Sequence, residues 1–263
     1  MSELLAPAKI NLALVVGPHR PDGRHEIVTV LQRISLADRI ALEPGDELHI
    51  EGFAEDTIVR RALEQLGAAA DTPPNWRVTI EKEIPVAAGL GGGSSDAAAA
   101  LRLANWTLRR PLEDSDLHGL AAPLGADIPF FLTTGPQLAE GDGTELQPLR
   151  LPQDYWILLI LPHGERKPST GAVYDAFSGE DGFPERRAAL LRALALGDLG
   201  GLPRNDLASS PLAEELRSHG AFRADVSGAG PAVYGLFSEQ DEALAAHAAL
   251  AAQERSWIAA PAW

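Results

Sequence analysis

The stretch Pro85–Ser95, PVAAGLGGGSS, decides the fold, because it joins a predicted strand to a predicted helix through a glycine loop. Four glycines within the five residues 89–93 allow backbone N–H groups to converge on an anion. The helix that follows adds unpaired N–H groups and the positive end of its dipole. Ser94 and Ser95 are typical N-cap residues, and their hydroxyls could also donate to phosphate oxygens. The predicted phosphate-binding loop comprises Pro85, Val86, Ala87, Ala88, Gly89, Leu90, Gly91, Gly92, Gly93, Ser94 and Ser95.

Two common phosphate-binding motifs are excluded by spacing. A P-loop, G-x-x-x-x-G-K-[ST], needs a Lys before the serines, and this chain has none there. The dinucleotide motif G-x-G-x-x-G would need Gly at position 94, which is Ser94. A flexible glycine loop whose serines only cap a helix is the remaining alternative, and a phosphate-binding loop is the interpretation we favour.

A second candidate group starts from Lys9 and Asn11, which interrupt the otherwise apolar stretch APAKINLAL. Strand alternation places both side chains on one face, and a partly buried Lys requires an anionic partner. Asp127, in LGADIPFF, is the candidate partner, since its apolar neighbours favour a low-dielectric pocket. Such a carboxylate can accept a proton from a substrate hydroxyl. Taken segment by segment, an edge-strand Lys and a turn or N-cap Asp are the alternatives.

A third motif is VSGAGPAVYG, residues 226–235, where two glycines separate two apolar predicted strands. We expect a tight hairpin connection whose backbone can approach another loop or a ligand. Its Gly-Ala-Gly composition also suits closure near a phosphate.

Composition excludes several classes of protein. The 263 residues include 22 Lys and Arg against 37 Asp and Glu, a formal net charge of −15, which argues against a non-specific nucleic-acid binder. The chain has no Cys, which excludes disulfides, thiol nucleophiles and Cys-based zinc sites. The seven His have no metal-ligand spacing. We recognise no targeting or membrane-spanning segment and expect a cytoplasmic protein.

Hydrophobic periodicity predicts a two-layer α/β or α+β chain. The predicted strands are residues 10–17, 76–84, 155–161, 222–227 and 231–237, with a hairpin over 39–52. The predicted helices are residues 56–70, 94–108, 113–125, 169–177, 185–196, 211–219 and 239–252, and residues 126–132 are expected to form a turn or short strand. A change of composition near residues 150–154 places the two domains at 1–152 and 153–263.

Together, APAKINLAL, the glycine loop and VSGAGPAVYGLF resemble the three ordered motifs of the GHMP kinase superfamily. One branch of the superfamily is more similar, on RPDGRHEI (20–27), SLADRI (35–40), LGADIPFF (124–131), AEGDGTEL (139–146) and RNDL (204–207). The resemblance extends over residues 6–237. It implies a two-domain α+β fold, with an S5 domain 2-like N-terminal ATP-binding domain and a ferredoxin-like C-terminal domain.

The resemblance also implies a reaction, the ATP- and Mg²⁺-dependent phosphorylation of the 2-hydroxyl of 4-diphosphocytidyl-2-C-methyl-D-erythritol (CDP-methylerythritol), in the non-mevalonate isoprenoid pathway. Asp127 matches the catalytic base, and Lys9 matches the lysine that contacts it and the transferring phosphate. Asn11 and His25 match positions that line the substrate, His25 being placed to bond the cytosine, and Tyr174 matches a position that stacks on that base. ATP and this small molecule are the expected partners, without nucleic acid or membrane. The Mg²⁺ ligands stay open.

One position departs from the pattern. The related kinases carry Tyr where this chain has Arg24, and that Tyr helps to sandwich the cytosine. The Arg24 guanidinium could still stack on the base, or it could turn to the diphosphate. The alternative functions are another small-molecule GHMP kinase and a non-catalytic metabolite sensor on the same fold. The presence of both Lys9 and Asp127 argues against the sensor, which needs no base.

Overall fold

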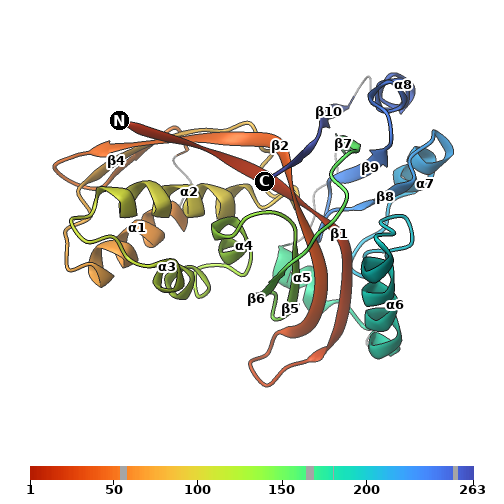
Figure 1. Cartoon of the computed structure of the whole chain (residues 1–263), viewed down its shortest axis with the longest axis horizontal. Coiled ribbons are helices and arrows are strands. Elements are labelled where there is room, and N and C mark those ends of the chain that lie inside the picture. Colours follow the sequence, from red (N-terminus) through yellow and green to blue (C-terminus); the bar gives the residue numbers. More distant parts are fainter. Residues whose placement is uncertain (54–57, 164–168, 180, 251–253) are drawn as a thin grey trace. The chain divides into compact units, whose positions relative to one another are not determined.

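The computed structural model describes residues 1–53, 58–163, 169–179, 181–250 and 254–263 (Figure 1). Its strands are β1 (Ser2–His19), β2 (His25–Pro44), β3 (His49–Glu51), β4 (Trp76–Glu81), β5 (Gln137–Gly141), β6 (Glu145–Pro148), β7 (Trp156–Leu161), β8 (Arg223–Val226), β9 (Val233–Phe237), β10 (Arg255–Ala259) and β11 (Pro261–Ala262). Its helices are α1 (Ile58–Ala69), α2 (Gly92–Thr107), α3 (Asp114–Ala121), α4 (Ile128–Leu132), α5 (Thr170–Asp175), α6 (Phe183–Leu196), α7 (Pro211–Ser218) and α8 (Gln240–Leu250).

The chain forms two compact units. The first unit comprises Met1–Ala8, Leu36–Val86 and Gly91–Thr134, and the second comprises Lys9–Ser35, Ala87–Leu90 and Gly135–Trp263. The long strands β1 and β2, which pair with each other, therefore contribute residues to both units. The glycine loop is also shared, because its residues 87–90 belong to the second unit and its remaining residues to the first.

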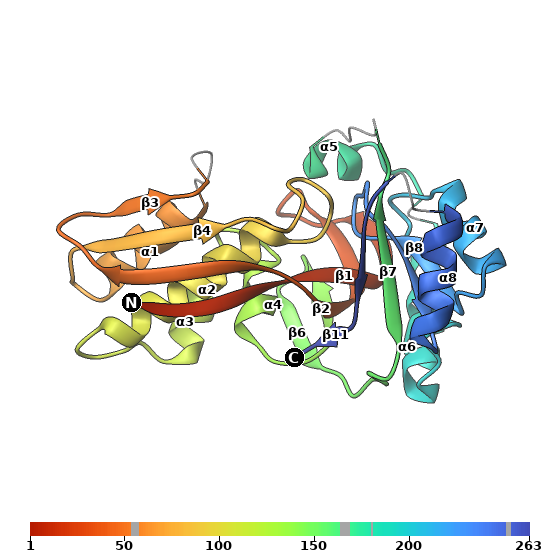
Figure 2. The same cartoon turned by 90° about the horizontal axis from the view of Figure 1, so that it is seen from above.

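In the first unit, helices cover strands. The C-terminal part of β2 pairs antiparallel with β4, and β4 pairs in parallel with β3. The helices α1 and α2 pack together on one face of these strands (Figures 1 and 2). Leu63 and Leu66 of α1 are fully buried, as is the small apolar face of α2 that includes Ala97 and Ala100. Close packing of this alanine-rich helix positions the end of the glycine loop.

The hairpin expected over residues 39–52 is wrong. Its first half is the end of β2, but its second half, β3, pairs with β4 rather than with β2. The chain does turn at Pro44–Asp46, as predicted. There the Gly45 N–H donates to the Asn75 carbonyl at 2.9 Å. Burial of Val78 and Ile80 between neighbouring strands explains the insertion of β4, since a central strand buries more apolar area than a two-stranded hairpin does.

The second unit holds two sets of paired strands. The N-terminal part of β2 pairs antiparallel with β5, which pairs with β6. A separate antiparallel sheet has the order β10-β7-β9-β8, and α7 and α8 pack on one of its faces (Figure 2). Its core joins Leu158 and Ile160 of β7 to Leu216 of α7 and Ala243 of α8.

Most of the other predicted elements are present, with shifted ends. Residues 126–132 are an exception, because they form the helix α4 instead of a turn or short strand; Pro129 fits the first helical turn, where its missing N–H costs nothing. The ends of the helices predicted over 56–70 and 239–252 lie partly outside the described residues. The division into domains 1–152 and 153–263 stays a prediction. None of the described helices has the length and hydropathy needed to cross a bilayer.

Candidate active site

The middle of the glycine loop, Ala87–Leu90, is held by residues of the second unit. The Ala232 N–H donates to the Ala88 carbonyl at 3.1 Å, and the Lys9 N–H donates to the Leu90 carbonyl at 2.9 Å. Gly89 has φ +84°, and a Cβ built on it would lie 2.2 Å from the Ser227 carbonyl oxygen. Only glycine allows this approach, so the backbone at Gly89 is fixed by contact with the turn after β8.

The end of the loop opens α2 in the first unit. Gly91, with φ 71°, precedes the first helical residue Gly92, and no side chain caps the helix. The prediction that Ser94 and Ser95 cap α2 is therefore wrong, because the glycines themselves enter the helix and place both serines in its first turn. The Ser95 hydroxyl is buried and has no hydrogen-bond partner among the described residues. It lies in the first turn of α2, and helix N-termini favour anions.

Asp127 stands at the start of α4, as its N-cap residue, and its side chain makes no capping hydrogen bond. The turn before it is closed by the Ile128 N–H, which donates to the Gly125 carbonyl at 3.0 Å. A Cβ at Gly125 would lie 3.9 Å from the Ser94 hydroxyl oxygen. The turn that carries Asp127 therefore lies next to the end of the glycine loop, within one unit.

Lys9 and Asn11 share one face of β1, as predicted. Lys9 is 4% exposed, and its Nζ donates to Asn11 Oδ1 at 2.6 Å. Asn11 Nδ2 donates to the Thr29 hydroxyl at 2.8 Å, and that hydroxyl donates to the Ala13 carbonyl. This chain of bonds holds the buried ammonium group in one place. Lys9 belongs to the second unit and Asp127 to the first, and their pairing stays a prediction.

His25 lies at the centre of an aromatic cluster in the second unit. Its ring centroid is 3.9 Å from that of His19, 6.0 Å from that of Tyr174 and 5.9 Å from that of Phe177. His25 is buried, and its Nδ1 is 2.8 Å from the Gly17 carbonyl oxygen, which can only accept a hydrogen bond, so that Nδ1 is the donor. Nε2 of the neutral ring is then an acceptor, and it has no partner among the described residues. Sequence motifs indicate His25 and Tyr174, but no motif indicates His19 or Phe177.

Arg24 is not part of this cluster of rings. Its guanidinium forms an ion pair with Asp142, and its side chain is 54% exposed. Burial opposes the charge on Asp142, but hydrogen bonds from Thr144 and the Arg24 charge outweigh it and lower the Asp142 pKa. In the described structure, Arg24 is therefore paired with the Asp142 carboxylate.

The first unit contains a buried ionic cluster that the sequence patterns did not predict. Lys82 Nζ donates to Asp38 Oδ2 at 2.5 Å and to Asp96 Oδ2 at 2.7 Å, and both carboxylates are fully buried. Burial and the Asp38 charge raise the pKa of Asp96 to about 7. Burial lowers the pKa of Lys82, but its two carboxylate partners outweigh this and raise it. The cluster could have been suspected from Asp38, a charged residue within a predominantly apolar strand pattern, just as Lys9 was selected.

The site residues divide between the two units. Lys9, Asn11, Arg24, His25 and Tyr174 lie in the second unit with Ala87–Leu90, while Asp127 and the remaining loop residues lie in the first. Within the described ranges, no group of three or more His, Asp or Glu side chains is arranged to hold a metal ion. Mg²⁺ in phosphoryl-transfer enzymes is commonly bound by substrate phosphates and one or two carboxylates, so an all-protein cage is not required.

Comparison with known proteins identifies the class. Residues 57–135 match the family model "GHMP kinases N terminal domain", and residues 186–255 match "GHMP kinases C terminal". A crystal structure of homoserine kinase from Cytophaga hutchinsonii shares the fold, with a TM-score of 0.73 at 17% identity, 97% of this chain and 94% of that one being covered. Fold and family models together define an ATP-dependent small-molecule kinase of the GHMP type.

Relatives with higher sequence identity to this chain show which branch of the GHMP kinases it belongs to. The 4-diphosphocytidyl-2-C-methyl-D-erythritol kinase of Thermus thermophilus is 41% identical, over 97% of this chain and 94% of the relative. That of Syntrophus aciditrophicus is 35% identical over 95% of each chain. A crystal structure of 4-(cytidine 5'-diphospho)-2C-methyl-D-erythritol kinase superposes with a TM-score of 0.83 at 36% identity, all of both chains being covered. The chain belongs to the 4-diphosphocytidyl-2-C-methyl-D-erythritol kinase family.

Proposed function

We propose that this kinase transfers the γ-phosphoryl group of ATP to the 2-hydroxyl of CDP-methylerythritol, a step of non-mevalonate isoprenoid synthesis. The observation that carries the cytidine specificity is the buried His25, whose acceptor Nε2 has no hydrogen-bond partner among the described residues. The exocyclic amine of cytosine is a donor that fits this acceptor. Tyr174 and Phe177 beside His25 supply aromatic faces for a base.

The glycine loop and the N-terminus of α2 bind the ATP phosphates in this proposal. Backbone N–H groups of residues 91–93 are unpaired within the helix and favour anions. The Ser95 hydroxyl can donate to a phosphate oxygen. Mg²⁺ bound to the phosphates would neutralise charge that develops during transfer. Proximity and electrostatic stabilisation then supply most of the acceleration, because phosphoryl transfer requires little covalent work from the protein.

Lys9 and Asp127 act on the reacting groups in this proposal. The Lys9 ammonium, held by Asn11, stabilises the oxygens of the transferring phosphoryl group. Asp127, at the start of α4 and beside the end of the glycine loop, orients the acceptor hydroxyl and takes its proton. Asn11 lines the acceptor site. We place the reaction in the cytoplasm, where ATP is available.

The test is ADP release with Mg·ATP over a panel of acceptors: CDP-methylerythritol, methylerythritol phosphate, mevalonate, phosphomevalonate, homoserine and galactose. We expect turnover with CDP-methylerythritol alone. Asp127→Asn should leave ATP affinity within about 3-fold and lower kcat by at least ~10²-fold, the lower end for loss of a general base. Lys9→Ala should also abolish most turnover. Asp116→Asn, an exposed aspartate of α3, is the matched control and should keep wild-type kcat.

Other outcomes identify the error. Turnover of a different acceptor would support kinase activity but refute the proposed cytosine pocket around His25. Unchanged kcat in Asp127→Asn would remove Asp127 from the mechanism. ATP binding without turnover of any acceptor would support the metabolite sensor.

A further inference from the structure

The Asn205 side chain, buried in the second unit, forms hydrogen bonds through both its nitrogen and its oxygen. Its Nδ2 donates to the carbonyls of Val226 at 2.9 Å and Gly228 at 2.5 Å. Its Oδ1 accepts from the Leu207 N–H at 2.9 Å, and its own N–H donates to Asp225 Oδ2 at 2.9 Å. Two of these four bonds hold the backbone at the start of the turn between β8 and β9.

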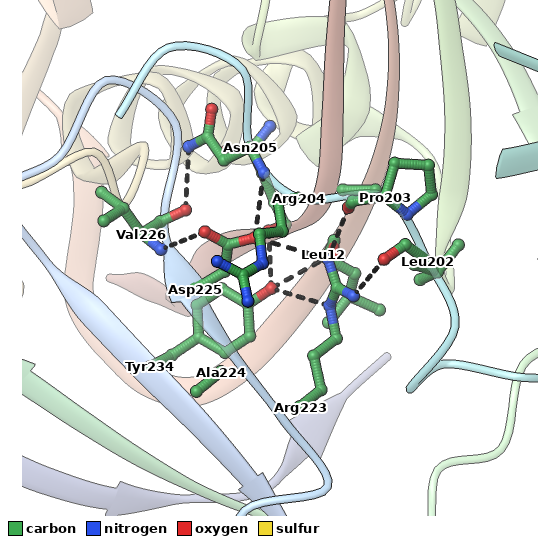
Figure 3. Close-up of polar contacts among 12 residues, drawn as sticks. Leu12, Leu202, Pro203, Arg204, Asn205, Arg223, Ala224, Asp225, Val226 and Tyr234 are labelled. Atoms are coloured by element: carbon green, nitrogen blue, oxygen red, sulfur yellow. Dashed lines mark hydrogen bonds and ion pairs between the residues drawn. The ribbon is translucent and has the colours of Figure 1, made fainter. Parts of the chain in front are cut away.

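Asn205 is itself held in place by Arg223, which is 4% exposed. The Arg223 guanidinium donates to the carbonyls of Leu202 at 2.7 Å and Pro203 at 2.8 Å, which lie three and two residues before Asn205 in the chain (Figure 3). It also lies 3.5 Å from Asp225, the carboxylate that accepts from the Asn205 backbone. The segment before Asn205 and the strand β8 are thus joined by a buried, charge-assisted network.

The turn that Asn205 holds packs directly on Lys9 and Asn11. A Cβ built at Gly228 would lie 3.1 Å from Asn11 Oδ1 and 3.5 Å from Lys9 Nζ, so the bare backbone of the turn faces this pair. The Ser227 hydroxyl accepts from the Asn11 N–H at 3.3 Å and donates to the Gly89 carbonyl at 2.9 Å. One turn therefore contacts both the Lys9–Asn11 pair and the glycine loop.

We propose that Asn205 is a positioning residue for phosphoryl transfer, which holds the Ser227–Gly228 backbone against Lys9 and Asn11. This inference rests on the proposed function for the roles of those two residues. Removal of the carboxamide leaves the buried carbonyls of Val226 and Gly228 without their donor. The turn then shifts, and a displacement of ~1 Å at a reacting group can cost ~10²-fold in rate. Asn205 touches neither substrate nor nucleotide in this account.

The experiment compares Asn205→Ala with Asn105→Ala. Asn105 is the matched control, because it is also a buried asparagine whose side chain donates to a carbonyl, that of Leu112 at 3.0 Å, and accepts from the Leu112 N–H at 2.8 Å. Both variants should lower Tm. We expect Asn205→Ala alone to lower kcat, by about 10- to 100-fold per folded molecule, with KM for ATP within ~3-fold. Asn105→Ala should keep kcat within ~2-fold.

Two further measurements separate positioning from general stability. In a double-mutant cycle with Asn11→Ala, the double variant should be no more than ~3-fold slower than Asn11→Ala alone, because both changes act on the same pair. Hydrogen exchange of the peptides covering residues 9–11 and 226–230 should quicken at least ~10-fold in Asn205→Ala and stay unchanged in Asn105→Ala. Asn205→Asp, which keeps the size but loses both donors, replaces Asn205→Ala if the latter is unfolded at the assay temperature.

Wild-type kcat in the Asn205 variant, or multiplied losses in the cycle, would overturn the inference while the proposed function stands. An inactive wild type would overturn the proposed function instead. The exchange comparison then decides the inference alone, since unchanged exchange at residues 9–11 would show that Asn205 does not hold this segment.

Discussion

At the scale of single residues, burial separates polar side chains that serve a site from those that face solvent. Lys9 and Asn11 are buried and bonded to each other, whereas Arg24 is largely exposed and pairs with Asp142. A buried ammonium group is costly to desolvate and must be compensated locally. An exposed ion pair is screened and contributes little to stability. The same residue type, a cation, therefore has different significance at positions 9 and 24.

The Arg24–Asp142 pair yields a prediction about this departure from the family pattern. Arg24→Tyr should change the free energy of unfolding by less than ~1 kcal/mol, because the pair is solvent-exposed. If the pair does not touch the substrate, KM for CDP-methylerythritol should be maintained or lowered, as a Tyr ring can stack on cytosine. Urea unfolding and initial rates measure the two quantities. A rise in KM of ~10-fold or more would instead assign Arg24 a charge contact with the diphosphate.

Two glycines with nearly equal φ form a matched pair for a second prediction. Gly89 has φ +84° and Gly23 has φ +82°, so alanine costs a similar backbone strain of ~1–2 kcal/mol at each. A Cβ at Gly23 meets nothing within 4 Å, but one at Gly89 would lie 2.2 Å from the Ser227 carbonyl oxygen. Gly89→Ala should therefore lose about 1–3 kcal/mol more than Gly23→Ala in chemical unfolding. Equal losses would mean that the loop is not held against Ser227.

At the scale of elements, the Asp38–Lys82–Asp96 cluster joins the strand β2, the residue after β4 and the second turn of α2. Asp38 Oδ1 also accepts from the backbone N–H groups of Glu83 at 2.6 Å and Ile84 at 2.8 Å. The chain entering the glycine loop is thereby fixed to the helix leaving it. One cation for two buried carboxylates also favours a proton on the cluster, which agrees with the raised pKa of Asp96.

This cluster makes stability depend on pH. The Asp96 pKa is about 7 in the folded chain and near its ordinary value of 3.8 when unfolded, so the folded state binds more protons between these values. Its stabilising contribution is full below about pH 4 and is lost as the pH rises through 7. Asp96→Asn should flatten this slope and raise stability at pH 8 by roughly 1–4 kcal/mol. Urea unfolding at several pH values measures it, with Asp116→Asn as the control. An unchanged slope would refute the raised pKa.

At the scale of the whole molecule, the glycine loop belongs to both compact units. Residues 87–90 are bonded to the second unit, and residues 91–95 begin α2 in the first. A nucleotide bound to the loop should therefore stabilise the folded chain as a whole.

Ligand linkage tests that expectation. A non-hydrolysable ATP analogue with Mg²⁺, at 100 times its Kd, should raise the free energy of unfolding by about 2.7 kcal/mol. For a chain of this size, Tm should rise by roughly 5–10 °C. Asp127→Asn should retain the rise, since Asp127 serves the acceptor and not the nucleotide. Thermal unfolding followed by circular dichroism measures both. No rise in the wild type would refute nucleotide binding at the loop.

The sequence alone determined the class of this protein and most of its elements. Periodicity predicted α1, α2, β7, β8 and β9, because an apolar face repeats with the period of its own element. The glycine loop was predictable because its conformation depends on local φ values that only glycine adopts readily. Lys9 and Asn11 were found because each is a polar residue within an apolar stretch, whereas His25 was found through the resemblance to the related kinases.

Only the tertiary structure decided how distant segments pair. In the structure, β4 lies between β2 and β3, and Arg24 pairs with Asp142. The helix α2 begins with glycines and has no serine cap. The tertiary structure also brought together His19 with Phe177 around His25, and Asn205 with Gly228. These contacts join residues far apart in the chain, and their energies depend on burial and on partners that local periodicity does not encode.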